Sequence, residues 1–261
     1  MKVSGWASGE APAPAQTEFL EVMFENHDKT WVLDTIRNRP SDAPFAYVIT
    51  PNVDHLVRLQ RTRSDLWPAY RNAWVTLCDS RILARLASFS GVQLPVIPGS
   101  DLTEALFLRT IDPDDRVAIL GGTPEAVALL ADRYRLRNVV HYNPPMGFIR
   151  DPAETARAVR FLVDARARYS LLAVGSPQQE LVAYRVARSG AATGIGLCVG
   201  ASLDFLTGDQ HRAPSAMQQL SLEWLFRLAS DPARMWRRYL LDGPSIFSIF
   251  DDWRRRRGSP T

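Results

Sequence analysis

The stretch VAILGGTPEAVALLADRYRLRNVVHY, residues 117–142, contains the unit on which the fold is built. Val117–Leu120 and Val139–Tyr142 are short runs of apolar and β-branched residues, which are typical of buried strands. Glu125–Tyr134 lies between them and has the apolar spacing of a helix. Because two parallel strands need a crossover connection, strand, helix and strand in close succession indicate parallel pairing.

The same alternation extends in both directions along the chain. Further strands are predicted at Phe45–Ile49, Trp74–Leu77, Leu171–Val174 and Ile195–Val199. Further helices are predicted at Val53–Arg63, Arg81–Phe89, Leu102–Arg109, Ala153–Arg168 and Gln178–Arg188. This pattern predicts an α/β fold with a Rossmann-like, mainly parallel sheet that helices cover on both faces.

The two ends of the chain differ from this pattern. Residues 1–17 are rich in Ala, Pro, Gly and Ser, and we expect them to be disordered. Helical patterns alone follow Leu203, at Ser215–Ala229, Pro232–Leu241 and Ser245–Arg257. We therefore divide the chain into an N-terminal segment (1–17), a catalytic domain (18–210) and a helical appendage (211–261).

The charge of the chain is concentrated in the appendage. The formal net charge is +3, and the residues from His211 onward contain nine arginines and five acidic residues, a formal +4. Such an excess indicates an anionic partner such as phosphate, nucleic acid or a membrane surface.

No segment has the length and apolar character of a membrane anchor. The N-terminus lacks the apolar run of a signal peptide, and the uncharged stretch Ser189–Leu203 is shorter than the roughly 20 residues of a spanning helix. Cys78 and Cys198 each lie in an apolar run, and we expect them to be inert, reduced core thiols.

Polar residues follow several predicted strands, at the edge where open parallel sheets bind ligands. After the first predicted strand, Thr50 could cap the next helix, with Pro51 at its first position. This interpretation leaves Asn52 as a candidate ligand contact. Asp79, after the second strand, is either a helix N-cap or a general base that takes the proton of a sugar hydroxyl.

Two glycine-containing turns occupy equivalent positions later in the chain. Gly121 and Gly122 precede a helix start at Thr123-Pro124, where backbone N–H groups and small residues admit a phosphate or ribose. In GSPQQE, residues 175–180, Ser176 and Gln179 have capping-box spacing, with Pro177 at the first helical position. Glu180 and one of the two glutamines remain available to a ligand.

The last cluster is GASLDFLTGDQHRAP, residues 200–214. A lone carboxylate such as Asp204 is usually a cap, but the basic appendage follows it directly. Arginines such as Arg212 could neutralise a diphosphate leaving group.

These motifs, taken in order, resemble those of the WecG/TagA/CpsF family of bacterial glycosyltransferases. The similarity spans about Phe45 to Leu240. It rests on TPN (50–52), CDS (78–80), PGSDL (98–102), GG (121–122), GSPQQE (175–180), VGASLDFLTGDQHRAP (199–214) and LEWLFRLASDPARMWRRYL (222–240).

The resemblance implies inverting, metal-independent transfer of a hexosyl unit from a UDP-sugar to an undecaprenyl-diphosphate-linked saccharide, without a cofactor. It implies Asp79 as the base. It also implies a substrate-binding set of Thr50, Asn52, Asp101, Gly121, Gly122, Gly175, Pro177, Gln179, Glu180, Asp204, Arg212, Arg227, Arg234, Arg237 and Arg238.

The sequence departs from the family pattern in places. Ser80 stands where relatives commonly have glycine, and Gln178 where they have lysine. Leu94–Pro98 contains no arginine, whereas many relatives carry one shortly before the segment that contains Asp101. These changes suggest a divergent branch, such as an exopolysaccharide glucosyltransferase of the xanthan type.

The resemblance implies a peripheral protein that acts at the cytoplasmic face of the inner membrane. Assembly into a homo-oligomer is compatible with the sequence, which does not determine it. Apolar residues alternate with Arg234, Arg237 and Arg238 as in an interfacial helix, namely Met235, Trp236, Tyr239, Leu240 and Leu241. Arg254–Arg257 would attract anionic lipids. The alternative is that the apolar residues pack on the core and the arginines are solvated.

Two other functions fit parts of the sequence. A nucleotide-dependent oxidoreductase would suit the α/β pattern, but the dinucleotide fingerprint is missing. A nucleic-acid-binding module would use the basic end, but no recognition motif accompanies it, so we expect no nucleic-acid partner.

We expect no metal site. The histidines are scattered along the chain. Asp112-Pro113-Asp114 matches the DxD of metal-dependent glycosyltransferases, but it precedes a predicted strand and therefore lies at the wrong end of the sheet, as a turn.

Overall fold

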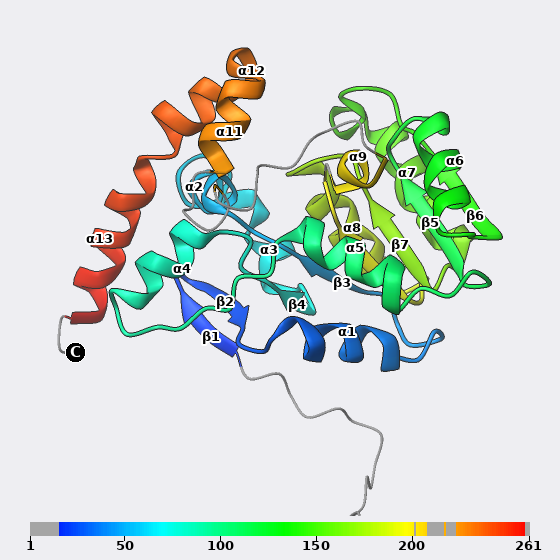
Figure 1. Ribbon diagram of the computed structural model, residues 1–261, viewed down its shortest axis with the longest axis horizontal. Coiled ribbons are helices and arrows are strands. Elements are labelled where there is room, and N and C mark those ends of the chain that lie inside the picture. Colours follow the sequence, from blue (N-terminus) through cyan, green and yellow to red (C-terminus); the bar gives the residue numbers. More distant parts are fainter. Residues whose placement is uncertain (1–15, 201, 208–216, 218–222, 259–261) are drawn as a thin grey trace, which may run out of the picture.

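The computed structural model describes residues 16–200, 202–207, 217 and 223–258. Its centre is a six-stranded, wholly parallel sheet in the order β4-β3-β8-β7-β5-β6 (Figure 1). The predicted α/β, Rossmann-like fold is confirmed. The strands are β3 (Ala46–Ile49), β4 (Val75–Thr76), β5 (Arg116–Leu120), β6 (Asn138–Tyr142), β7 (Tyr169–Leu172) and β8 (Ile195–Cys198).

Successive side chains of the central strands enter two separate apolar cores. In β3, Tyr47 and Ile49 face one core and Val48 faces the other, while in β5 Ala118 and Ile119 divide in the same way. All of these residues are buried. A strand that is covered on both faces must be apolar at nearly every position, which is why these strands read as continuous apolar runs.

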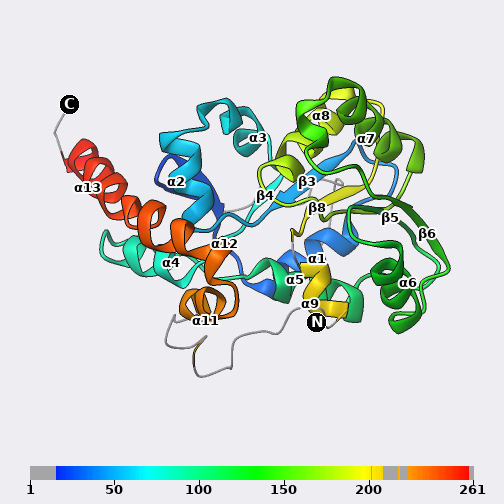
Figure 2. The ribbon, with the colours of Figure 1, turned by 90° about the horizontal axis from the view of Figure 1, so that it is seen from above.

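Helices cover both faces of the sheet, as Figure 2 shows. The first core includes side chains of α2 (Val53–Arg61), α3 (Trp67–Arg71), α4 (Arg81–Ser88), α7 (Pro152–Ala165) and α8 (Gln178–Ser189). The second includes side chains of α1 (Lys29–Asn38), α5 (Gly99–Arg109), α6 (Pro124–Arg133) and α9 (Ser202–Thr207). Short 3₁₀ turns lie at η1 (Ser64–Leu66) and η2 (Phe148–Arg150).

An N-terminal hairpin, which the sequence analysis missed, precedes the sheet. It pairs β1 (Gln16–Phe19) with β2 (Val22–Glu25), so two of its residues fall in the segment predicted to be disordered. Leu20 and Glu21 form the turn with φ of 53° and 65°. Asn and Gly normally fill such positive-φ turn positions, so the usual sequence signal for a hairpin is absent.

Helix α1 was also missed, although its sequence carries a start signal. Asp28 caps it, with the side chain accepting a hydrogen bond from Trp31 N, and Val32, Leu33 and Ile36 form its buried face.

The C-terminal part is helical, as predicted, and lies beside α2 and α4 on the side of the molecule away from α6 (Figure 1). It contains α11 (Glu223–Ser230), α12 (Pro232–Trp236), a π-helical turn η3 (Arg237–Asp242) and α13 (Ser245–Gly258). The helix predicted at Pro232–Leu241 is thus divided into α12 and η3. The first residues of the helix predicted at Ser215–Ala229 lie outside the described residues.

Helix α13 is part of the core. Ile246, Ile249, Phe250 and Trp253 are all buried, and the ring of Trp253 meets that of Phe19 edge-on with the centroids 5.1 Å apart. The apolar face of α13 thus packs on the core, although the sequence raised that alternative for the residues near Trp236 and Leu240. By contrast, large apolar side chains of α12, η3 and the start of α13 are exposed, namely Trp236, Leu240, Leu241 and Phe247.

Candidate functional site

The sheet has a topological switch point between β5 and β7. Helix α6 follows β5 on one face of the sheet, and α8 follows β7 on the other. The two connecting loops therefore part at the carboxyl edge, which is the position where open α/β sheets usually bind ligands.

Gly121 lies at this switch point and must be glycine. Its φ is 97°, and a Cβ there would lie 2.7 Å from the carbonyl oxygen of Ala173 in the loop after β7. The Gly121 N–H donates to Tyr142 O at 2.9 Å, which holds the turn in place. Thr123 caps α6 by accepting from Ala126 N, with Pro124 at the first position, so the predicted helix start is confirmed.

His141, which the sequence analysis did not single out, braces this turn. Its Nε2 lies 3.1 Å from Gly121 O and 3.2 Å from Gly122 O. Because both partners are carbonyl oxygens, Nε2 carries the hydrogen that is shared between them.

The loops after β3 and β4 bring three predicted motifs together. Asp79 N donates to Pro51 O at 3.0 Å, and Ile97 N donates to Cys78 O at 2.9 Å. A Cβ on Gly99 would lie 2.7 Å from the hydroxyl oxygen of Thr50, so the segment that contains Asp101 packs against it. Thr50, Asn52, Asp79 and Asp101 are all half-buried.

The helix caps in this region differ from the predictions. Asn52, not Thr50, is the N-cap of α2, and its side chain accepts from His55 N at 3.4 Å. The N-cap interpretation of Asp79 is also excluded, since Ser80 caps α4 by accepting from Leu83 N. Asn52 thus has a structural role, while the capping explanation for Asp79 is removed.

The loop after β7 also lacks the predicted cap. Helix α8 begins at Gln178, and Pro177 precedes it without a side-chain cap bond, so the capping box of Ser176 and Gln179 is wrong. Instead the Gln179 Oε1 accepts from Gly200 N at 2.8 Å, and its Nε2 donates to Glu180 Oε1 at 2.9 Å. Gln179 therefore links the loops that follow β7 and β8.

Glu180 lies beneath the edge rather than on it. The residue is 1% exposed, and Oε2 has no hydrogen bond of normal geometry among the described residues. Burial raises the pKa of Glu180, and the Gln179 amide, Ser176 and Arg58 oppose this shift. The direct ligand contact expected of Glu180 is therefore not available in this arrangement.

Arg58 is a second residue that the sequence analysis missed. It lies on α2, where it pairs with Asp54, and its Nη1 donates to the hydroxyl of Ser176 at 3.1 Å. The guanidinium thus joins the loop after β7 to the helix after β3. A basic residue two turns inside an amphipathic helix carries no sequence signal for such a role.

The remaining predicted residues are partly described. Gly175, with φ of 76°, and Pro177 lie in the loop after β7, and Arg237 is exposed on η3. Arg212 lies outside the described residues. The backbone is described, but the side chain is not, for Asp204 in α9, Arg227 in α11, Arg234 in α12 and Arg238 in η3.

Leu94–Pro98, the stretch without the arginine that the resemblance led us to expect, extends the edge of the sheet. Val96 bridges Cys78 in parallel, and Leu94 and Ile97 are buried. Both cysteines are free and buried, and burial raises the pKa of the Cys78 thiol to about 12, as expected of inert core thiols.

The Asp112-Pro113-Asp114 segment is a turn at the amino end of β5, as predicted. Asp112 N donates to Asp115 Oδ2 at 2.8 Å, and Asp114 pairs with Arg137 at 2.7 Å. Within the described parts of the chain, no three His, Cys, Asp or Glu side chains gather as metal ligands.

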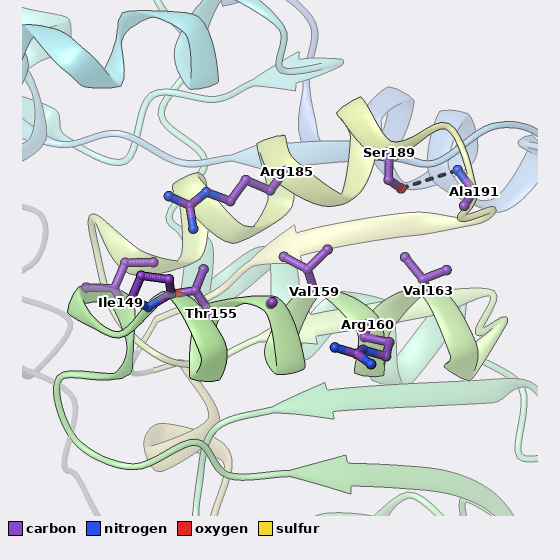
Figure 3. A pocket seen from close by; sticks show the side chains of 10 residues that line it. Ile149, Thr155, Val159, Arg160, Val163, Arg185, Ser189 and Ala191 are labelled. Atoms are coloured by element: carbon purple, nitrogen blue, oxygen red, sulfur yellow. Dashed lines mark hydrogen bonds between the residues drawn. The ribbon is translucent and has the colours of Figure 1, made fainter.

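A cavity of about 520 Å³ lies elsewhere, between α7 and α8 (Figure 3). Apolar side chains such as Val159 and Val163 line it, together with Arg160 and Arg185. No residue of the predicted site lines this cavity. We therefore place the candidate site at the carboxyl edge, where polar side chains of several loops converge.

A parallel sheet with a polar carboxyl edge at a switch point is the architecture of nucleotide-binding α/β proteins. Residues 17–259 match the model of the glycosyl transferase WecG/TagA/CpsF family. The chain belongs to this family, which confirms the resemblance and makes the protein a glycosyltransferase. In the residues described, no helix combines the length and hydropathy needed to cross a bilayer.

Proposed function

We propose that the protein moves a hexosyl unit from a UDP-sugar to an undecaprenyl-diphosphate-linked saccharide, with inversion at the anomeric carbon and without a metal ion. The product would serve bacterial cell-surface or exopolysaccharide synthesis. Family membership favours transfer over the oxidoreductase and nucleic-acid-binding alternatives.

The observation that carries this proposal is the position of Asp79. Its side chain is half-exposed at the carboxyl edge, its backbone is tied to Pro51, and Ser80 performs the capping of α4. A carboxylate so placed can take the proton of the acceptor hydroxyl as its oxygen attacks the anomeric carbon. The bond from that carbon to the diphosphate breaks, and UDP leaves.

The distance between Asp79 and the Gly121-Gly122 turn along the edge of the sheet favours an elongated ligand. Strands β4 and β5 are four strand spacings apart in the sheet order, which corresponds to roughly 19 Å. Asp79 and the Gly121-Gly122 turn therefore cannot contact one small group. An elongated nucleotide sugar suits this span, with its nucleotide near the switch point and its sugar toward Asp79, close to Asn52.

The C-terminal helices supply the charge and the membrane contact in this proposal. Their arginines, including Arg237, would stabilise the departing diphosphate. Trp236, Leu240 and Leu241 are exposed beside Arg237, an arrangement that suits a peripheral contact with an anionic bilayer surface.

The activity is tested by incubating the purified protein with a panel of UDP-sugars and synthetic lipid-diphosphate acceptors. Release of UDP that depends on both substrates, with a product of inverted configuration, is the expected result. UDP release without any acceptor product, or quenching of tryptophan fluorescence by NAD but not by UDP, would contradict the proposal.

The membrane contact is tested by flotation with vesicles that contain anionic lipid. Replacing Trp236, Leu240 and Leu241 together by Ser should abolish flotation if these side chains insert. The matched control changes Leu108 and Leu129, which are exposed on α5 and α6, and should float like the wild type. Flotation of the triple variant like that of the control and the wild type would remove the exposed surface of α12 and η3 as the contact.

A further inference from the structure

A hydrogen-bond chain connects the loop after β8 with the first turn of α8 at the carboxyl edge. It runs from Gly200 through the side chain of Gln179 to the carboxyl of Glu180, and beside it a separate bond joins Arg58 on α2 to Ser176 in the loop after β7. We propose that Glu180 is a positioning residue, which orients the Gln179 amide and through it the turn from β8 into α9. The inference rests on the proposed function, because it assigns Glu180 a part in that reaction.

The chemistry of the partners allows only one orientation of the Gln179 amide. The backbone N–H of Gly200 is a donor, so the amide must present Oε1 to it, at 2.8 Å. The NH₂ group then points to Glu180 Oε1, 2.9 Å away. Without an acceptor at position 180, this NH₂ group would lie buried and unpaired, because Gln179 is only 4% exposed.

A carboxyl at position 180 is an unfavourable choice for stability alone. Glu180 is 1% exposed, burial together with its charge raises the pKa of the nearby Tyr70 and Cys198 side chains, and its Oε2 has no hydrogen bond of normal geometry among the described residues. An apolar side chain of the same length would fill such a site without desolvating a polar oxygen. The hydrogen bond that it accepts from the Gln179 amide therefore explains the carboxyl at position 180, whereas burial of apolar surface does not.

The turn at Gly200, which the Gln179 amide holds in place, connects this hydrogen-bond chain to the proposed reaction. Gly200 has φ of 52° and begins the connection from β8 to α9, the helix that contains Asp204. The same connection lies at the edge beside the loop after β3, because β8 pairs with β3. A shift of this turn would move the wall of the candidate site next to Thr50 and Asn52, and small misplacements of such walls are costly to catalysis.

The test compares Glu180→Met with Glu180→Gln. Methionine keeps the length but removes the acceptor, so kcat/KM should fall by roughly 10–100-fold. The melting temperature should stay close to that of the wild type, because removal of the desolvated carboxyl offsets the cost of the unpaired Gln179 amide. Glutamine keeps an acceptor oxygen, so its kcat/KM should stay within about threefold of the wild type. Full activity of Glu180→Met, or a loss of activity that only follows a lower melting temperature, would overturn the proposal.

A double-mutant cycle tests the route through Gln179. If Glu180 acts only by holding the amide, adding Glu180→Met to Gln179→Ala should change kcat/KM by less than about twofold. Independent, additive losses would mean that Glu180 acts by another route.

Hydrogen exchange of the Gly200 amide provides a readout that needs no substrate. We expect faster exchange in Glu180→Met and Gln179→Ala than in the wild type or Glu180→Gln, since the acceptor of the Gly200 N–H is then lost or misoriented. Unchanged exchange of the Gly200 amide in Glu180→Met would contradict the inference, whatever the activity of that variant. Absence of sugar transfer by the wild-type protein, with exchange as expected, would instead count against the proposed function.

Discussion

The two halves of the carboxyl edge use polar residues in opposite ways. After β4, Asp79 is half-exposed, and its neighbour Ser80 performs the local capping. After β7, Gln179 and Glu180 are buried, and the Gln179 amide donates to Glu180 and accepts from Gly200 N. Both halves carry polar residues at equivalent strand ends, so such a position alone does not distinguish a residue that meets substrate from one that supports the site.

This difference is reflected in what each side chain can do. A half-exposed carboxylate can exchange protons with a bound acceptor, whereas a buried carboxyl can only hold its protein neighbours. Burial also raises the pKa of Glu180, which disfavours its charged form. We therefore expect Asp79→Asn to alter turnover with little change in stability, and Glu180→Gln to alter stability with little change in turnover.

The largest expected effect is that of Asp79→Asn. The amide cannot accept the proton of the acceptor hydroxyl, so kcat should fall by about 10²–10⁴-fold, with an unchanged melting temperature. The matched control is Ser80→Ala, which removes the cap of α4 and should cost about 0.5–2 kcal/mol of stability while keeping most of the activity. Near-normal turnover of Asp79→Asn would show that Asp79 is not the base, and the two halves of the edge would then not differ in the way proposed.

The switch point is tested by a pair of glycine substitutions. Gly121→Ala places a Cβ 2.7 Å from Ala173 O at φ of 97°, and should lower the free energy of unfolding by roughly 1–3 kcal/mol and weaken UDP binding. In Gly122→Ala the nearest atom is 3.8 Å away, so only the backbone strain at φ of 77° remains. Urea unfolding and fluorescence titration with UDP measure both effects, and equal losses in the two variants would contradict the steric argument.

Asn52 caps α2 and is also a candidate contact of the donor, and two substitutions can separate these roles. Asn52→Asp keeps an acceptor for His55 N and should preserve stability, whereas Asn52→Ala should cost about 1 kcal/mol through loss of the cap. If the amide also contacts the sugar of the donor, both variants should bind the UDP-sugar more weakly. Wild-type affinity of Asn52→Asp for the UDP-sugar would leave Asn52 with its capping role alone.

The smallest expected effect concerns pH. The folded pKa of Glu180 lies above the ordinary value of 4.5, so the folded state binds its proton more tightly than the unfolded state does. Glu180 therefore reduces stability increasingly as pH rises from about 4.5 toward its folded pKa. Relative to the wild type, Glu180→Gln should gain stability over that range, as urea unfolding at several pH values would measure. A difference that does not vary with pH would contradict a buried, titrating carboxyl.

Most of the sheet could be predicted from sequence because its strands are buried on both faces. Val117–Leu120 and Ile195–Cys198 are continuous apolar runs, which leave little ambiguity about their state. The hairpin could not be predicted in the same way, since Leu20 and Glu21 adopt turn conformations that their residue types rarely favour.

The location of the site could also be predicted, because a parallel sheet places every loop after a strand at the same edge. The details could not. Capping depends on where each helix begins, and the shift from Thr50 to Asn52 and from Asp79 to Ser80 is small in sequence but changes which side chain is engaged. The partners of Glu180 and His141 depend on tertiary contacts that no local pattern encodes.

The contact between α13 and the N-terminal hairpin has a consequence for synthesis of the protein. Arg256 pairs with Glu21 across 235 residues, and Phe19 is covered by Phe250 and Trp253. At about 5–20 residues per second, a growing chain must wait roughly 10–50 s between making the first of these residues and the last. During translation, Phe19 thus lacks its native cover until α13 leaves the ribosome, so we expect ribosome-bound intermediates to depend on chaperones at this hairpin.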